Sequence, residues 1–157
     1  MDEILISCKD GVCASEVEGK SSIEGITPDY ITQLSPNEIF VFGSNLEGRH
    51  YGGAAAIAAK FFGAEMGKGV GIQGQSYAIP TMQGGVETIK PYVDDFIQYA
   101  KVHPDKQFLV TRIGCGIAGF KDEEIAPLFS SCADMKNVSL PKGWREMGQH
   151  LVIEKTI

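Results

Sequence analysis

Three short, mostly apolar segments alternate with helix-forming segments along this chain, and this alternation constrains its fold more than any other feature. The segments are 39–42 (IFVF), 77–80 (YAIP) and 108–113 (FLVTRI), and each ends at or next to a glycine or proline. Such runs are typical of strands buried on both faces. The pattern predicts an α/β fold, with three layers and a mixed central sheet between helices on both faces. A length of 157 residues is that of one domain, so we expect residues 1–157 to form a single unit.

The helices are expected between these strands. The alanine-rich residues 52–67 predict the first, ended by Gly63 or Gly67. Thr88 is expected to cap the second, with Pro91 in its first turn, where its missing N–H costs little. A third helix is predicted from residue 122 to about 135, with Pro127 near its first turns.

A short edge strand is expected at 3–7, and further strands are expected at 138–140 and 151–154. Residues 1–30 are interpreted as an N-terminal extension, and the sequence assigns them no role. No internal repeat, low-complexity tract or linker divides the chain.

A formal net charge of −6 limits the classes of partner. Binding to nucleic-acid duplexes or to anionic membranes requires clustered lysine and arginine, so neither is expected. A small anion remains compatible with this charge, because backbone N–H groups bind anions locally.

The cysteines indicate a reducing compartment. Cys8, Cys13, Cys115 and Cys132 form no CxxC pair and no zinc-type spacing, so we expect free thiols, no metal site and no cofactor. A disulfide between Cys8 and Cys13 is the less favoured alternative. The start of the chain is acidic and unlike a signal peptide, so a cytoplasmic protein is expected.

Two glycine-rich loops are the candidate binding elements. GSNLEGRHYGG (residues 43–53) and GCGIAGF (residues 114–120) each follow a predicted strand and lead into a predicted helix. Ligands in α/β sheets bind beyond the carboxyl ends of the strands, and bare N–H groups at a helix N-terminus attract phosphate. The alternative is that these glycines only form tight turns. Neither loop matches a Walker A motif, and GCGIAG lacks the acidic residue expected of a dinucleotide fingerprint.

The region from about residue 31 to residue 140 resembles the macrodomain family, which binds ADP-ribose or hydrolyses its linkages. ITQLSPNEIFVFGSN is similar to the family's entry strand, GGAAAIAAKFFGA to its glycine-rich loop and first helix, and YAIPT to its middle strand. RIGCGIAGF resembles the loop around the diphosphate, and RIGCG is similar to the branch of ADP-ribosyl-acyl hydrolases. VFGSNLEGRH together with RIGCGIAG is also similar to an uncharacterised group in phages and bacteria.

The resemblance implies residue roles. Asn45 would hydrogen-bond the distal ribose, and Gly52 and Gly53 would allow the backbone to approach the ribose and diphosphate. The second loop would enclose the diphosphate, with Phe120 packing along the ribose. The complete set of expected ligand-binding residues is Gly43, Ser44, Asn45, Arg49, Gly52, Gly53, Gly114, Cys115, Gly116, Ile117, Ala118, Gly119 and Phe120.

The sequence also departs from the family. Tyr30 stands at the position of the adenine-reading aspartate, with Asp29 one place earlier. Ala118 stands where the acyl-hydrolase branch has a catalytic aspartate, and Thr81 or Met82 where it has a catalytic lysine. These departures argue against the lysine-dependent mechanism of that branch.

Three side chains have alternative interpretations. His50 could act as an acid or base, and Arg49 could pair with a phosphate, or both are ordinary exposed loop residues. Cys115 could be a nucleophile, but no Cys/His pattern accompanies it, and a small apolar residue under the loop is the favoured interpretation.

Two further groups of residues are assigned to structure. We expect the carboxylates of residues 122–124 to cap the third helix. Trp144 and Phe120 could stack on a base, but packing is the favoured role.

The sequence thus favours recognition of ADP-ribose, a related nucleoside diphosphate or an ADP-ribosylated macromolecule. Hydrolysis of an ADP-ribosyl bond remains open, with Asn45 orienting the substrate and His50 as base. The alternative is an accessory interaction module, related to phage proteins, that keeps the fold without binding nucleotide.

Overall fold

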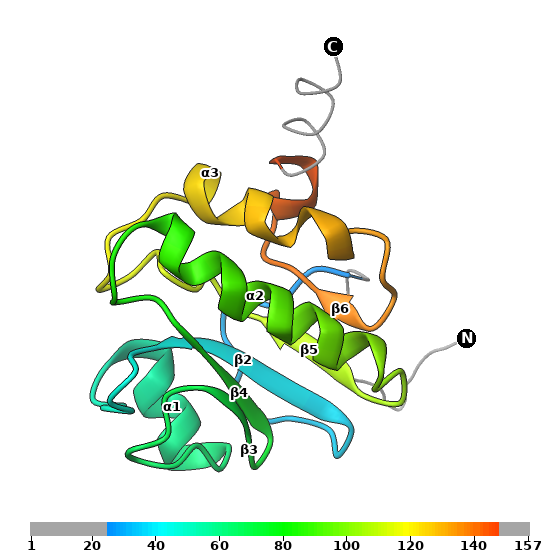
Figure 1. The fold of residues 1–157 in the computed structure, drawn as a ribbon. Coiled ribbons are helices and arrows are strands. Elements are labelled where there is room, and N and C mark those ends of the chain that lie inside the picture. Colours follow the sequence, from blue (N-terminus) through cyan, green and yellow to red (C-terminus); the bar gives the residue numbers. More distant parts are fainter. Residues whose placement is uncertain (1–24, 148–157) are drawn as a thin grey trace.

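The computed structural model describes residues 25–147. The strands expected at 3–7 and 151–154 lie outside this range, as do Cys8 and Cys13. Within it the chain forms a single α/β unit with five strands and four helices (Figure 1).

The sheet is mixed and has β2 (Glu38–Ser44) at its centre. β2 pairs in parallel with β4 (Ser76–Pro80) and with β5 (Gln107–Val110). β6 (Val138–Ser139) extends the parallel part next to β5, and β3 (Gly71–Gln73) is antiparallel to β4 at the other edge. The prediction of a mixed sheet that is parallel at its centre is confirmed.

Helices cover both faces of this sheet, as predicted. α1 (Gly53–Phe61) lies on one face, and α2 (Val86–Lys101) lies on the other (Figure 1). α3 (Asp122–Ile125) and the 3₁₀ helix η2 (Ala126–Cys132) complete the second layer beside α2.

The apolar run of β2 supplies both layers of the core. Ile39 and Val41 belong to the core cluster under α2 and η2, whereas Phe40 and Phe42 belong to the smaller cluster under α1. Successive side chains of a strand point to opposite faces. A continuous apolar run was therefore the correct signal for a strand covered on both sides.

The strand predictions need three corrections. The strand expected at 108–113 ends at Val110, because the chain turns out of the sheet, where Ile113 donates its N–H to Thr111 O. β3 was not predicted, since three residues with one buried side chain carry no periodic signal. Leu140 continues beyond β6 as an isolated bridge to Ile26, so the end of the expected N-terminal extension joins the sheet edge.

The start of α2 also differs from the prediction. The helix begins at Val86, and its N-cap is Gly85 rather than Thr88. Thr88 instead donates its hydroxyl to Gly85 O over 2.6 Å. Pro91 consequently lies inside the helix rather than in its first turn, where its ring removes one backbone hydrogen bond.

The third predicted helix is present, but it changes from an α-helix to a 3₁₀ helix along its length. Only residues 122–125 are α-helical, and the chain continues as the 3₁₀ helix η2 with Pro127 at its start. Proline lacks the N–H that a continuing α-helix needs, so the change coincides with it. The first helix ends as expected before Gly63, which has a φ of 83°.

No helix within residues 25–147 is long and apolar enough to cross a bilayer.

Candidate functional site

A cavity of about 350 Å³ lies beyond the carboxyl ends of β2, β4 and β5. Ser44 at the end of β2, Thr81 directly after β4 and Thr111 directly after β5 contribute to its wall. Parallel strands bring their carboxyl ends to the same edge, which is where α/β sheets bind ligands. The volume lies within the range of small-molecule sites.

The first loop is closed by the side chain of Asn45. Its Oδ1 accepts the N–H of Arg49 over 2.8 Å, and its Nδ2 donates to Arg49 O over 3.1 Å. Gly48 also donates its N–H to Asn45 O. Asn45 lines the cavity, but both polar atoms of its amide already hold the loop that carries Arg49.

This loop rests on the backbone of residues 67–69. Ser44 donates its hydroxyl to Gly69 O, and Gly67 donates its N–H to Gly48 O. A Cβ at Gly48 would lie 2.3 Å from Lys68 N, and one at Gly69 would lie 2.0 Å from Asn45 O. The two segments are in direct backbone contact, which only glycine permits.

His50 is buried, at 3% exposure, and does not line the cavity. Its Nε2 lies 3.1 Å from Lys68 O, and its ring meets that of Phe42 edge-on with centroids 5.3 Å apart. The alternative that His50 is an ordinary exposed residue is therefore wrong. It packs on Phe42 and Lys68 and is not among the residues that line the cavity.

The N-terminus of α1 opens on the cavity. Gly52 is the N-cap, its first turn carries no acidic residue, and no side chain caps it. Gly52, Ala54 and Ala55 line the cavity. The first N–H groups of a helix lack intrahelical partners and carry the positive end of its dipole. This end of α1 therefore presents bare donors to the cavity.

The second loop also contributes backbone donors to the wall of the cavity. Gly114, Gly116, Ile117 and Ala118 line the cavity. No backbone carbonyl in residues 25–147 accepts the N–H of Gly116, Ile117 or Ala118. Three backbone hydrogen bonds shape the loop, from Cys115 N to Arg112 O, from Gly119 N to Gly116 O and from Phe120 N to Gly114 O.

The two loops approach each other closely. A Cβ at Gly52 would lie 3.3 Å from the side chain of Ile117, and one at Gly43 would lie 3.3 Å from Gly114 N. Ile117 is 78% exposed. It lines the cavity next to Gly52 with most of its side chain exposed to solvent.

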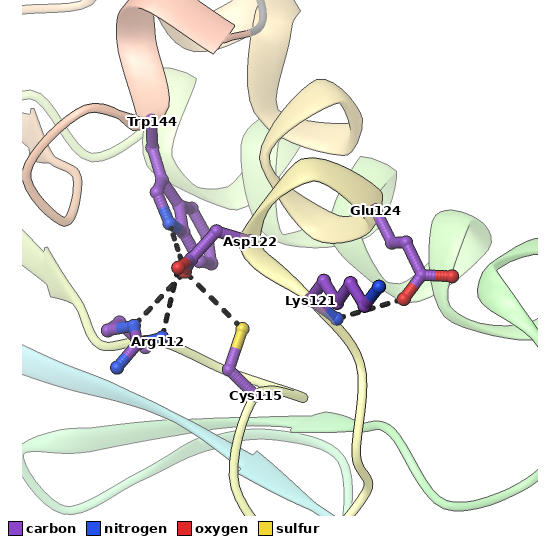
Figure 2. A network of polar contacts seen from close by, with 6 residues as sticks. All are labelled: Arg112, Cys115, Lys121, Asp122, Glu124 and Trp144. Atoms are coloured by element: carbon purple, nitrogen blue, oxygen red, sulfur yellow. Dashed lines mark hydrogen bonds and ion pairs between the residues drawn. The ribbon is translucent and has the colours of Figure 1, made fainter.

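A polar network holds the second loop to α3 (Figure 2). Asp122 accepts from Arg112 Nε over 3.0 Å at Oδ1 and from Arg112 Nη2 over 2.9 Å at Oδ2. The buried Trp144 donates its Nε1–H to Oδ1 over 2.8 Å. The hydrogen bonds from Arg112 are the main reason that the pKa of Asp122 is lowered.

The structure tests the structural roles expected for Glu124, Asp122 and Trp144. Glu124 does cap α3, since its Oε1 accepts the N–H of Lys121 over 2.9 Å. Asp122 does not, because its carboxylate is taken by Arg112 and Trp144. Trp144 is 1% exposed and packs on Phe129, as the packing interpretation required.

Cys115 belongs to this network rather than to the cavity. Its Sγ lies 3.5 Å from Asp122 Oδ1, and its side chain packs on the core under α2. Burial first and the charge of Asp122 second raise the pKa of the thiol to about 11. A thiol held in its protonated form is a poor nucleophile.

The structure brings most of the expected ligand-binding residues to one cavity. Those that line it are Gly43, Ser44, Asn45, Arg49, Gly52, Gly114, Gly116, Ile117 and Ala118. Gly53, Cys115, Gly119 and Phe120 do not line it. These four residues belong to the two loops without lining the cavity. Phe120, for example, packs against the core.

Sequence reasoning missed several cavity residues. Thr81 and Met82 were noted only as the places of an absent lysine. Tyr51, Ala54, Ala55, Thr111, Arg112 and Ile113 were not proposed. Arg112 had a usable signal, because it is a cation directly after a strand that ends at the ligand edge.

No protein-family model, no curated protein and no solved structure matches this chain. The resemblance to macrodomains therefore rests on the motifs, and the function must be argued from the cavity.

Proposed function

We propose that the cavity of this macrodomain-like domain binds ADP-ribose or a related nucleoside diphosphate, free or attached to a macromolecule. The carrying observation is that two segments with backbone N–H groups that no backbone carbonyl of residues 25–147 accepts line one cavity. One segment is Gly52, Ala54 and Ala55 at the start of α1, and the other is Gly116–Ala118. Donors of this kind from two loops suit an anion with several oxygens, such as a diphosphate.

The charges around the cavity support an anionic ligand. Among residues 25–147, the only charged residues that line it are Arg49 and Arg112, although the chain as a whole has a net charge of −6. Guanidinium groups bind phosphate with two parallel hydrogen bonds. A local excess of cations in an acidic protein favours a small anion over an extended polyanion.

Binding is favoured over hydrolysis. Among the described residues that line the cavity, none carries a carboxylate or an imidazole. A general base must lie within hydrogen-bond reach of the water that it activates. Ala118, at the position of the catalytic aspartate that the resemblance implies, lines the cavity without such a group.

Asn45 keeps a narrower role in this proposal. Its amide is engaged by Arg49, but Nδ2 has a second N–H and Oδ1 a second lone pair. A ribose hydroxyl can therefore bond to Asn45 without opening the loop. His50 takes no part, because it lies outside the cavity.

Calorimetric titration with ADP-ribose, ADP, AMP and NAD tests the proposal. We expect heat with ADP-ribose and ADP and a weaker response to AMP, which lacks the second phosphate. No heat from any of the four at millimolar ligand would contradict nucleotide binding, and would favour the interaction module.

A charge placed at the helix N-terminus sharpens this test. Ala54→Asp puts a carboxylate at the cavity end of α1, where it stabilises the helix dipole but repels a phosphate. Ile57→Asp is the matched control, since residue 57 is on the same helix, is 40% exposed and does not line the cavity. We expect Ala54→Asp to lose at least tenfold in affinity with its fold intact, and Ile57→Asp to bind as the wild type does. Equal binding by the two variants would place the phosphates elsewhere.

A further inference from the structure

Arg112 has two contacts that differ in kind. It lines the cavity, and it also forms an ion pair with Asp122, with Nη2 2.9 Å from Oδ2. Its side chain is 60% exposed, so an unsupported arginine here would sample many rotamers. The ion pair selects one of them.

The geometry of the pair leaves part of the guanidinium free. Asp122 accepts from Nε and from Nη2, which form the side edge of the group. A guanidinium has five N–H donors, and its end edge, made of Nη1 and the second N–H of Nη2, is a separate parallel pair. That end edge can still bind a phosphate with two hydrogen bonds.

Asp122 is itself held in place from the far side. Trp144 is 1% exposed and donates its Nε1–H to Oδ1 over 2.8 Å (Figure 2). Asp122 is also the first residue of α3, so its backbone is part of the helix that continues directly into η2. The hydrogen bonds that join Trp144 to Asp122 and Asp122 to Arg112 thus connect the buried core to the wall of the cavity.

We propose that Arg112 contacts the phosphate of the bound ligand through its end edge, and that Asp122 is the positioning residue that fixes it there. This inference rests on the proposed function and deepens it, because it names the side chain that recognises the ligand's charge. It requires a ligand with an oxyanion next to the second loop, as in a nucleoside diphosphate.

Two effects of Asp122 on anion binding oppose each other. Its negative charge weakens the attraction of Arg112 for phosphate, whereas the bidentate bond removes the cost of ordering a long side chain. The Arg112 side chain is 60% exposed and that of Asp122 is 28% exposed, so solvent and salt screen part of the charge, and we expect the ordering effect to be the larger one. Removal of the charge of Asp122 should therefore weaken anion binding, although simple charge counting predicts the opposite.

The experiment is a double-mutant cycle on ADP-ribose affinity, with inorganic pyrophosphate as a second probe. Asp122→Asn keeps an oxygen for Trp144 Nε1–H but cannot form the bidentate ion pair. Arg112→Gln removes the guanidinium. Asp94→Asn is the matched control, because Asp94 forms an exposed ion pair with Lys90 on α2, away from the cavity. The melting temperature of each variant is measured in parallel.

We expect Asp122→Asn to lose about fivefold and Arg112→Gln about tenfold in affinity, and Asp94→Asn to lose nothing. In the Arg112→Gln background, Asp122→Asn should have no further effect. A purely structural role for Asp122 would weaken binding equally in both backgrounds, which would overturn the inference. Unchanged or tighter binding by Asp122→Asn would overturn it as well and leave the proposed function intact. A wild-type protein that binds neither probe would overturn both proposals.

Discussion

The two loops that bound the cavity are both rich in glycine, yet they are held in place differently. The first loop is fixed by backbone packing, since Gly48 and Gly69 leave no room for a Cβ against residues 67–68 and Asn45. The second is fixed by side chains, through Arg112, Asp122 and Trp144. Around Gly116 in the second loop, a Cβ would meet nothing within 4 Å.

This difference shows that glycine serves two purposes in one site. In the first loop it permits contact between two backbone segments, so the loop has one shape. In the second it leaves N–H groups uncovered around an open space, and the shape depends on an ion pair at its base. We therefore expect the first loop to keep one geometry. In the second loop, we expect a side-chain substitution to change the geometry without unfolding the domain.

Gly48→Ala should have the largest effect on stability. The added Cβ overlaps Lys68 N and Gly67, and the φ of 72° is itself unfavourable for alanine. We expect a loss of at least about 3 kcal/mol in the free energy of unfolding, measured by urea denaturation. The control is Gly116→Ala in the second loop, for which we expect less than about 1 kcal/mol. Similar losses at the two positions would remove the distinction between the loops.

Asp122→Asn should have an intermediate effect on the free energy of unfolding, and this effect should depend on pH. Hydrogen bonds from Arg112 lower the pKa of Asp122, so the carboxylate stabilises the fold above the unfolded-state pKa of about 3.9. That contribution is lost as pH falls through the lowered folded-state value. We expect Asp122→Asn to cost about 1 kcal/mol at pH 7.

Melting temperatures between pH 7 and pH 3 test this dependence. The difference between wild type and Asp122→Asn should narrow below about pH 4, where the carboxyl of the unfolded chain begins to bind protons while the folded-state carboxyl, with its lowered pKa, stays ionised. Asp94→Asn serves again as the control for an exposed ion pair. A difference that stays constant over the whole range would show that the ion pair does not hold the second loop.

Asn45→Ala should have a smaller effect, confined to the first loop. It removes two hydrogen bonds to the backbone of Arg49 that are exposed to solvent. We expect a loss of about 0.5–1 kcal/mol, because water replaces the amide at an exposed site. Asn45→Asp keeps the acceptor for Arg49 N and should retain part of that stability. A loss as large as that of Gly48→Ala would show that the amide, rather than the backbone contact, fixes the loop.

Cys115→Ala should have the smallest effect on stability, about 0.5 kcal/mol, since it removes one partly buried sulfur at the edge of the core, and the polar contact of that sulfur to Asp122 is long. The thiol should also react slowly. With a pKa of about 11, its alkylation by iodoacetamide at pH 8 should be roughly 100-fold slower than that of a free cysteine, measured on the Cys115 peptide by mass spectrometry. A rate equal to that of free cysteine would reopen a nucleophilic role.

Much of the architecture could be predicted because it depends on local patterns. The apolar run at 39–42 predicted a strand buried on both faces, and β2 places Phe40 and Phe42 on one side and Ile39 and Val41 on the other. Gly63 was a correct end for the first helix. β3 was missed because its pairing with β4 is its only support, and pairing partners are not visible in a segment of three residues.

The sequence by itself determined the layer order of the domain and the edge of the sheet at which the cavity lies. Hydrophobic periodicity and glycine-rich connections are local properties, and the rule that parallel strands bring their carboxyl ends together needs nothing more. Only the tertiary structure decided which loop residues face the cavity. It buried His50 against Phe42, placed the thiol of Cys115 next to Asp122, and brought Trp144 to Asp122 across 22 positions of sequence. Those contacts depend on how separate elements pack together, and no short window of sequence contains that information.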